Sequence, residues 1–87
     1  MLTLTDAHLP KGWHVIKSLE LAVEEDPDND LVYVSDDVFR QYGMGETEVE
    51  ALVDYGRNLT EFFEIIAAGD NVFDARTLDR LQTYLRK

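Results

Sequence analysis

Residues 42–52 read Tyr42-Gly43-Met44-Gly45-Glu46-Thr47-Glu48-Val49-Glu50-Ala51-Leu52, and this stretch sets where the main helix begins. Thr47 and Glu50 have the spacing of a capping box, in which the threonine oxygen accepts from a backbone N–H three residues on. The glutamate in turn reaches back to the N–H of the threonine. Glu46, Glu48 and Glu50 lie where the positive end of a helix dipole favours carboxylates. A helix is therefore predicted to start here.

An apolar stripe continues from this start through Ile66. Its members recur at helical spacings, with Tyr55 and Gly56 filling the intervening turn: Val49, Leu52, Leu59, Phe62, Phe63 and Ile66. Ala67, Ala68 and Gly69 then supply a stop. We predict a long helix over residues 47–68 against which the rest of the fold packs. Gly56 inside this helix costs about 1 kcal/mol relative to alanine. We attribute the presence of a glycine here to close packing of the helix on a sheet.

Upstream of the helix, the pattern is that of a β-hairpin. Residues 19–24 alternate, with Leu19, Leu21 and Val23 on one predicted face. Residues 26–30, Asp-Pro-Asp-Asn-Asp, combine turn-forming side chains, and residues 31–35 are β-branched and aromatic. Residues 36–43 fit two structures equally: a single helical turn capped by Ser35 and ending at Gly43, or a turn at the two aspartates that returns as a third strand.

The two ends of the chain are expected to cover the core. Residues 1–17 are predicted to form an extended arm that contributes Leu2, Leu4, Leu9 and Trp13. Residues 74–87 are predicted to form a short helix capped by Asp74, with a stripe of Leu78, Leu81 and Leu85. A helix this short must dock on the sheet, the long helix or another subunit. The expected fold is a single α+β domain over residues 1–87, with an antiparallel sheet of about three strands within residues 18–45.

Charge is the strongest compositional feature of the 87 residues. The chain has 18 acidic and 8 basic side chains, and residues 20–64 hold 14 of the acids but only two of the bases. Direct binding of nucleic acid needs a basic surface and is therefore not expected. A field of this sign steers a basic protein partner. The simpler alternative is that acidity keeps a small protein soluble.

The sequence offers little for cofactor or catalytic chemistry. There is no cysteine, no secretory signal and no membrane-spanning run, so we expect a cytoplasmic protein. Residues 26–30 begin like a calcium loop, but Leu31 stands where that loop needs glycine. His8 and His14 match no metal spacing. We therefore expect no metal, no cofactor and no enzymatic activity.

The middle of the chain resembles the HicB-like antitoxins. The resemblance rests on the acidic strand and turn of residues 21–30, the strand of residues 31–35 and the stretch 42–52, and it covers residues 19–66. In that family, a Gly-x-Gly-x-Thr run joins the third strand to a helix with a Glu-Glu-Ala-like start. The matching residues here are Gly43, Gly45, Thr47, Glu50, Ala51 and Leu52.

The resemblance implies a fold and a partner. It favours a strand before the helix, in a partial ribonuclease-H-like sheet with the order β-β-β-α-α. It also implies binding and silencing of a small basic RNA-cleaving toxin of the HicA-like type. Many family members append a DNA-binding module, but only 19 residues follow Ala68, so a solitary HicB-like domain is expected.

Three binding functions follow from these observations. The first is an antitoxin-like module whose acidic side chains attract a basic partner, through Glu24, Glu25, Asp26, Asp28, Asp30, Asp36 and Asp37. The second is a homo-oligomer, for example a homodimer, formed through a free sheet edge or the C-terminal leucine stripe, with no toxin partner. The third is an acidic mimic of nucleic acid, which would bind several unrelated basic proteins.

Overall fold

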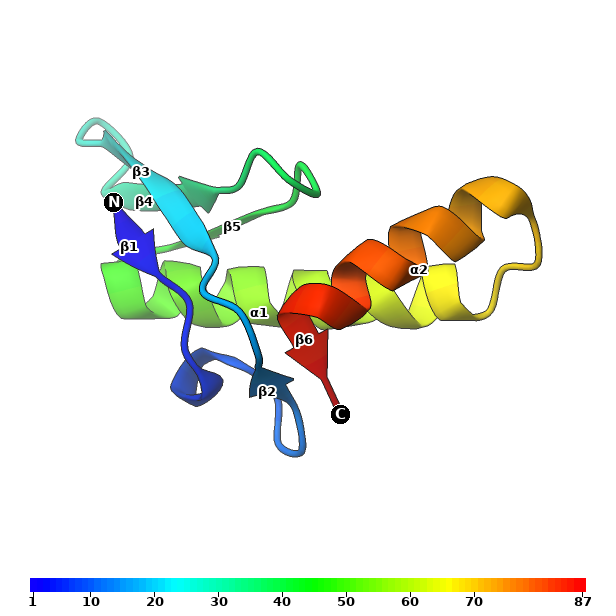
Figure 1. Cartoon of the computed structure of the whole chain (residues 1–87). Helices are drawn as coiled ribbons and strands as arrows, with labels where there is room; N and C mark the ends of the chain where they lie inside the picture. Colours follow the sequence, from blue (N-terminus) through cyan, green and yellow to red (C-terminus); the bar gives the residue numbers. More distant parts are fainter.

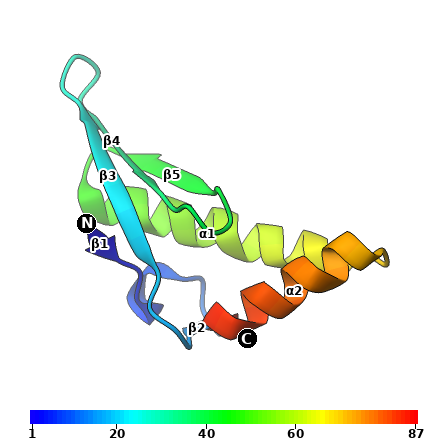
Figure 2. The same ribbon diagram turned by 45° about the horizontal axis from the view of Figure 1, so that its top comes forward.

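The computed structural model describes residues 1–87, in which a four-stranded antiparallel sheet lies on one long helix (Figures 1 and 2). The elements in chain order are β1 (Leu2–Thr3), the 3₁₀ turn η1 (Asp6–His8), β2 (His14–Val15), β3 (Glu20–Asp26), β4 (Leu31–Ser35), β5 (Tyr42–Gly45), α1 (Glu48–Ala67), α2 (Val72–Tyr84) and β6 (Leu85–Arg86). The main sheet has the order β1-β3-β4-β5, and β2 pairs with β6 in a separate two-stranded sheet. The predicted α+β class is confirmed, and neither helix is long and apolar enough to cross a membrane.

The start of α1 agrees with the sequence pattern in part. Thr47 caps the helix, and its hydroxyl oxygen accepts from the backbone N–H of Glu50 at 3.1 Å. The Glu50 carboxylate accepts from this hydroxyl at 3.4 Å, a contact within the cap in place of the predicted return to the backbone. At the other end, Ala68 ends the helix in a right-handed conformation, and Gly69 does not adopt the left-handed conformation of a glycine stop.

The buried face of α1 is centred on Tyr55. Tyr55, Ala51 and Leu59 are fully buried, whereas Val49, predicted to face the core, is 62% exposed. The difference arises because β5 lies along the Ala51–Tyr55 side of the helix and so selects which part of the wide apolar stripe is covered. Half of the six-residue stripe is buried, namely Leu52, Leu59 and Ile66, whereas Phe62 and Phe63 are, like Val49, at least partly exposed.

Two glycines allow the close approaches that hold these layers together. A Cβ atom on Gly43 would lie 2.2 Å from the Tyr55 nitrogen and 2.5 Å from the Ala51 carbonyl oxygen. One on Gly56 would lie 2.2 Å from the His8 carbonyl oxygen. Gly43 therefore brings β5 onto α1, whereas Gly56 receives the N-terminal arm. The prediction that Gly56 packs on the sheet was wrong, because η1 occupies that side of the helix.

Residues 36–43, for which the sequence left two structures open, form a loop followed by the start of a strand. The helical turn capped by Ser35 does not form. Asp36 is 6% exposed, and its carboxylate accepts from the backbone N–H of Phe39 at 2.5 Å and of Gln41 at 3.0 Å. These bonds fold residues 36–41 into a compact loop, and β5 then pairs with β4 from Tyr42 to Gly45. A third strand is therefore present, but only Tyr42 and Gly43 of residues 36–43 belong to it, and it continues to Gly45.

Both chain ends cover the core, as expected, and they also pair with each other. Within the arm, Leu4 and Trp13 are buried, and β1 adds a fourth strand beside β3. Helix α2 begins earlier than predicted because Asn71, rather than Asp74, caps it, accepting from the Asp74 N–H at 2.8 Å. It also ends earlier, at Tyr84, because Leu85–Arg86 pairs with β2 of the arm.

The Tyr55 hydroxyl is buried without a hydrogen-bond partner. Burial raises the pKa of Tyr55 far above its usual value of 10.0, and the negative charge of Asp36 raises it further. The unfolded chain therefore loses this proton at a lower pH than the folded protein does. Stability from this group is complete below about pH 10 and falls as the pH rises beyond it.

We predict that Gly43→Ala lowers the free energy of unfolding by about 3 kcal/mol, because the new Cβ meets backbone atoms that cannot rotate away. Gly12→Ala is the matched control. Gly12 has a φ of 94° but no heavy atom within 4 Å of the added carbon, so its cost is limited to about 1 kcal/mol of backbone strain. Urea unfolding measures both, and equal losses would contradict the close-approach explanation.

We predict that the wild-type protein loses up to about 1.4 kcal/mol of stability per pH unit above pH 10 through Tyr55. Tyr55→Phe removes this component, because phenylalanine cannot ionise. Tyr42→Phe, at a tyrosine that is 63% exposed, should keep the wild-type slope. Urea unfolding between about pH 9 and pH 11 gives the slopes, and identical slopes for all three proteins would refute the assignment.

Candidate partner-binding surface

The β3–β4 hairpin projects from the sheet and carries an acidic tip. Pro27 follows Asp26, whose carbonyl accepts from the Asn29 N–H at 3.3 Å, while its carboxylate accepts from the Asn29 side chain at 2.8 Å. Asp30 closes the turn in the left-handed conformation, with a φ of 52°. These local bonds hold the tip in one shape and leave Asp28 and Asp30 exposed. Figures 1 and 2 show that the hairpin projects away from the rest of the molecule near the N-terminal end of α1.

The structure divides the seven predicted partner-binding residues into two groups. Five lie at the hairpin tip: Glu24, Glu25, Asp26, Asp28 and Asp30. Asp36 and Asp37 follow the opposite end of β4, roughly 16 Å away at the rise of a strand. The Asp36 carboxylate is buried and bonded within its loop, so it is a structural group. Asp37 is exposed but lies apart from the tip.

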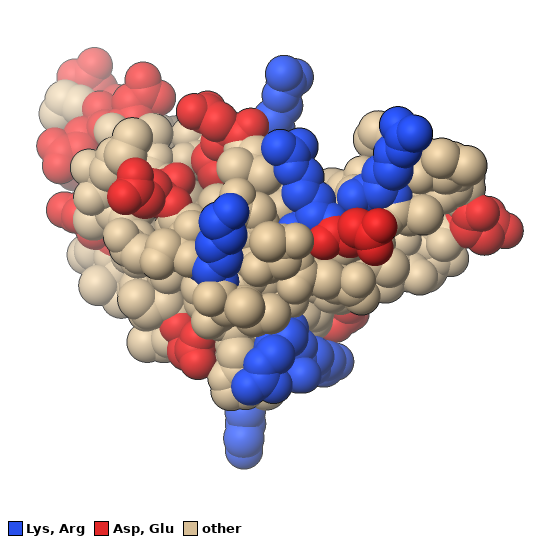
Figure 3. Space-filling model, viewed as in Figure 1, with Lys and Arg blue, Asp and Glu red and all other residues tan.

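A sixth carboxylate joins the tip through the sheet register. Glu46 lines the same shallow hollow of about 280 Å³ as Glu25, Asp26 and Asp30. The register explains this, because Glu25 pairs with Val32 and Val32 pairs with Gly45, immediately before Glu46. We call these six side chains (Glu24, Glu25, Asp26, Asp28, Asp30 and Glu46) the acidic tip. Figure 3 shows acidic side chains gathered at the hairpin end of the molecule.

An uncovered sheet face begins beside the acidic tip. The register places Glu24, Tyr33 and Met44 side by side on the face opposite α1. Tyr42 and Met44 are 63% and 48% exposed on this face. The N-terminal arm leaves this face uncovered, because β1 adds to the edge of the sheet and η1 packs on α1. The pattern of residues 31–35 predicted a strand. It did not predict the exposed face, because that face also includes residues of β5.

The two edges of the sheet differ in their availability for pairing. On β5, the Met44 N–H donates to the Asp54 carboxylate at 2.9 Å, and the Tyr42 carbonyl accepts from the Asn58 side chain at 2.9 Å. Side chains of α1 therefore occupy outward backbone groups of this edge, and Asp54 is itself paired with Arg57. On the opposite edge, β1 covers only Glu20 and Leu21 of β3. The remainder of β3, next to the acidic tip, pairs with β4 on one side and has no neighbouring strand on the other.

Metal-binding geometry is absent from the chain. No group of three or more histidine, aspartate or glutamate side chains is placed to hold a metal ion. His8 accepts from the Thr5 N–H at 3.1 Å, and His14 pairs with Asp6 at 3.0 Å. The N–H of Val15 and the His14 side chain hold the pKa of Asp6 below its usual value. Both histidines therefore act in the architecture of the arm.

Comparison with known proteins gives no relative. No protein-family model matches the chain, and no curated protein and no solved structure shows significant similarity to it.

We predict that Asp30→Gly raises the free energy of unfolding by about 0.5–1 kcal/mol, because glycine adopts the left-handed conformation without strain. Asp28→Gly removes the same charge at a position without a positive φ and should be neutral or destabilising. Thermal unfolding of the two variants checks this difference. An equal gain in both would assign the effect to reduced charge repulsion instead.

Proposed function

We propose that this protein is a small, non-enzymatic binding module of the antitoxin type that acts in the cytoplasm on one basic protein partner. The observation that carries the proposal is the acidic tip, which presents five carboxylates on a projecting hairpin and a sixth, Glu46, beside it, with no basic side chain among them. Such a cluster raises the association rate of a basic protein. It also lowers the affinity for acidic proteins and for nucleic acid.

The uncovered sheet face supports a specific contact in addition to attraction by charge. Tyr33, Tyr42 and Met44 lie next to Glu24 on the same face. Tyrosine and methionine are enriched in protein interfaces, where a buried apolar centre contributes most of the affinity. A partner that spans the tip and this face therefore meets a charged rim and an apolar centre.

The resemblance to HicB-like antitoxins supports the class of partner. Gly43 and Gly45 lie in β5 and Thr47 caps α1, and these three residues carry the resemblance at the strand-to-helix junction. A small basic RNA-cleaving toxin is the partner that this resemblance favours, and the acidic tip complements it in charge.

A homo-oligomer is the second candidate, and the open part of β3 favours it. Val23 and Glu25 lie on this edge and do not pair with β1. A second copy could pair there only by bringing two acidic tips together, which costs electrostatic energy at low salt. Self-association that strengthens with salt would point to this alternative.

The test combines light scattering with co-expression of a basic protein encoded beside this chain. We expect a stable complex that survives about 0.5 M salt, where the screening length is only about 4 Å. Asp28→Lys/Asp30→Lys should slow association at least about tenfold at low salt. The matched control Asp70→Lys/Asp79→Lys makes the same charge change at exposed residues on or before α2 and should change the rate much less.

The apolar part of the interface is tested separately. Tyr42→Ala/Met44→Ala should speed dissociation of the complex at high salt while changing the unfolding free energy by less than about 1 kcal/mol. Equal binding to unrelated basic proteins such as lysozyme and cytochrome c, lost in high salt, would favour the nucleic-acid mimic. A self-associated protein without a partner would refute the dedicated antitoxin.

A further inference from the structure

A hollow between α2, α1 and the loop before β5 differs from the rest of this acidic surface. It encloses about 440 Å³ and is lined by Val38, Phe39, Arg40, Phe62, Phe73, Arg76, Thr77 and Arg80. None of these residues is acidic. Each of the other four hollows of the molecule is lined by at least one glutamate. The absence of carboxylates here is notable in a chain with 18 acids.

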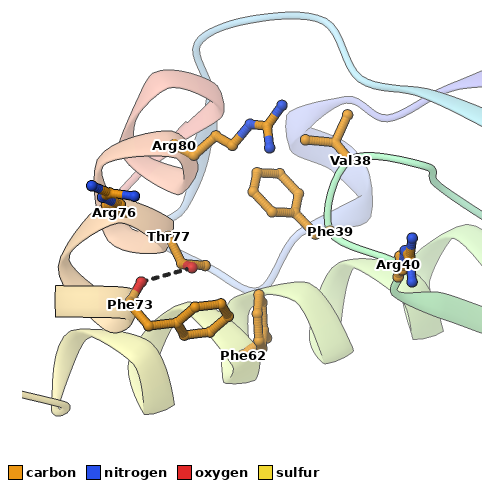
Figure 4. A pocket seen from close by; sticks show the side chains of 8 residues that line it. All are labelled: Val38, Phe39, Arg40, Phe62, Phe73, Arg76, Thr77 and Arg80. Carbon is orange, nitrogen blue, oxygen red and sulfur yellow. Dashed lines mark hydrogen bonds between the residues drawn. The ribbon is translucent and has the colours of Figure 1, made fainter. Parts of the chain in front are cut away.

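The hollow contains three of the eight basic residues of the chain. Arg40, Arg76 and Arg80 form no salt bridge, whereas Arg57 pairs with Asp54 and Lys87 pairs with Glu64. Arg76 and Arg80 are one helical turn apart on α2, and Arg40 comes from the opposite wall. Three arginines without a salt bridge therefore line one hollow, with Arg76 and Arg80 on the α2 side and Arg40 across from them (Figure 4).

Arg40 is held in an uncommon backbone conformation. Its φ is 56°, which costs an arginine about 1 kcal/mol relative to glycine. Asp36 fixes this conformation, since it accepts from the backbone on both sides of Arg40, at Phe39 and Gln41. The loop thus keeps the Arg40 side chain at the rim of the hollow.

Aromatic rings form the apolar part of the same hollow. Figure 4 shows the Phe62 and Phe73 rings on one side and the Phe39 ring near Arg80. Phe73 is 72% exposed, and Thr77 is turned toward its carbonyl by a hydrogen bond of 3.0 Å. An exposed phenyl ring beside guanidinium groups suits a ligand with a flat ring and an anionic group.

We propose that this hollow binds a free nucleoside phosphate, with the base against the Phe73 ring and the phosphate between the arginines. Guanidinium groups bind phosphate oxygens in a bidentate geometry, and bases stack on aromatic side chains. The volume lies within the range of small-molecule sites, about 300–1,000 Å³. The net charge of −10 disfavours a long polyanion, because phosphates outside the hollow would face the acidic surface.

The test is calorimetric and NMR titration of the purified protein with AMP, ADP, GMP and GDP, up to about 5 mM in low salt. We expect saturable binding to one site, with shifts at Phe39, Phe73 and Arg80. Arg76→Gln/Arg80→Gln should weaken it at least about tenfold. Arg57→Gln/Arg86→Gln removes two guanidinium groups outside the hollow and should leave the affinity within about twofold.

The stacking contact has its own matched pair of variants. Phe73→Ala should weaken nucleotide binding, whereas Val72→Ala, at a residue equally 72% exposed, should not. Inorganic phosphate should bind more weakly than any nucleotide.

Four results would overturn the proposal. The first is no saturation by any nucleotide, and the second is equal binding by inorganic phosphate. The third is tighter binding of a single-stranded oligonucleotide than of a nucleotide. The fourth is salt-sensitive self-association lost in Arg76→Gln/Arg80→Gln, which would assign the hollow to the acidic tip of a second copy.

Discussion

The contact of β5 with α1 is the constraint on which the rest of the structure depends. Gly43 has no side chain to separate the strand from the backbone of Ala51 and Tyr55, so the sheet lies directly on the helix. Asp54 and Asn58 then bond the outward backbone of the same strand. The strand is held by β4 on one side and by α1 side chains on the other. This double attachment fixes which sheet face is covered and which is available for binding.

The separation of charge follows from that arrangement. The β3–β4 hairpin extends beyond the end of α1, so its acidic side chains stay hydrated and need no partner within the protein. Among the seven carboxylates predicted to bind a partner, only Asp36 is buried, and it accepts hydrogen bonds from two backbone N–H groups. At the other end of β4, the loop that Asp36 organises places Arg40 opposite α2. The hairpin thus presents negative charge, whereas Arg40 joins Arg76 and Arg80 of α2 at a different place on the molecule.

The small size of the domain explains why both chain ends are used in the core. A chain of 87 residues buries a modest apolar area. The arm and α2 increase it, with Leu4, Trp13, Leu81 and Leu85 all buried. The pairing of β2 with β6 joins the two ends, so the arm and the C-terminal helix support each other rather than docking separately.

Local chemistry in the sequence determined the elements of this fold, because caps, alternation and turn residues act over three to five positions. Thr47 marked the start of α1, residues 19–24 and 31–35 marked the hairpin, and the acid-rich turn marked the tip. Tertiary structure alone decided that Val49 is exposed, that Asp36 is buried and that Glu46 joins the tip. It also gathered Arg40, Arg76 and Arg80, which lie on segments up to 40 positions apart in the sequence. These outcomes depend on register and packing between distant segments, and no periodicity within one segment encodes them.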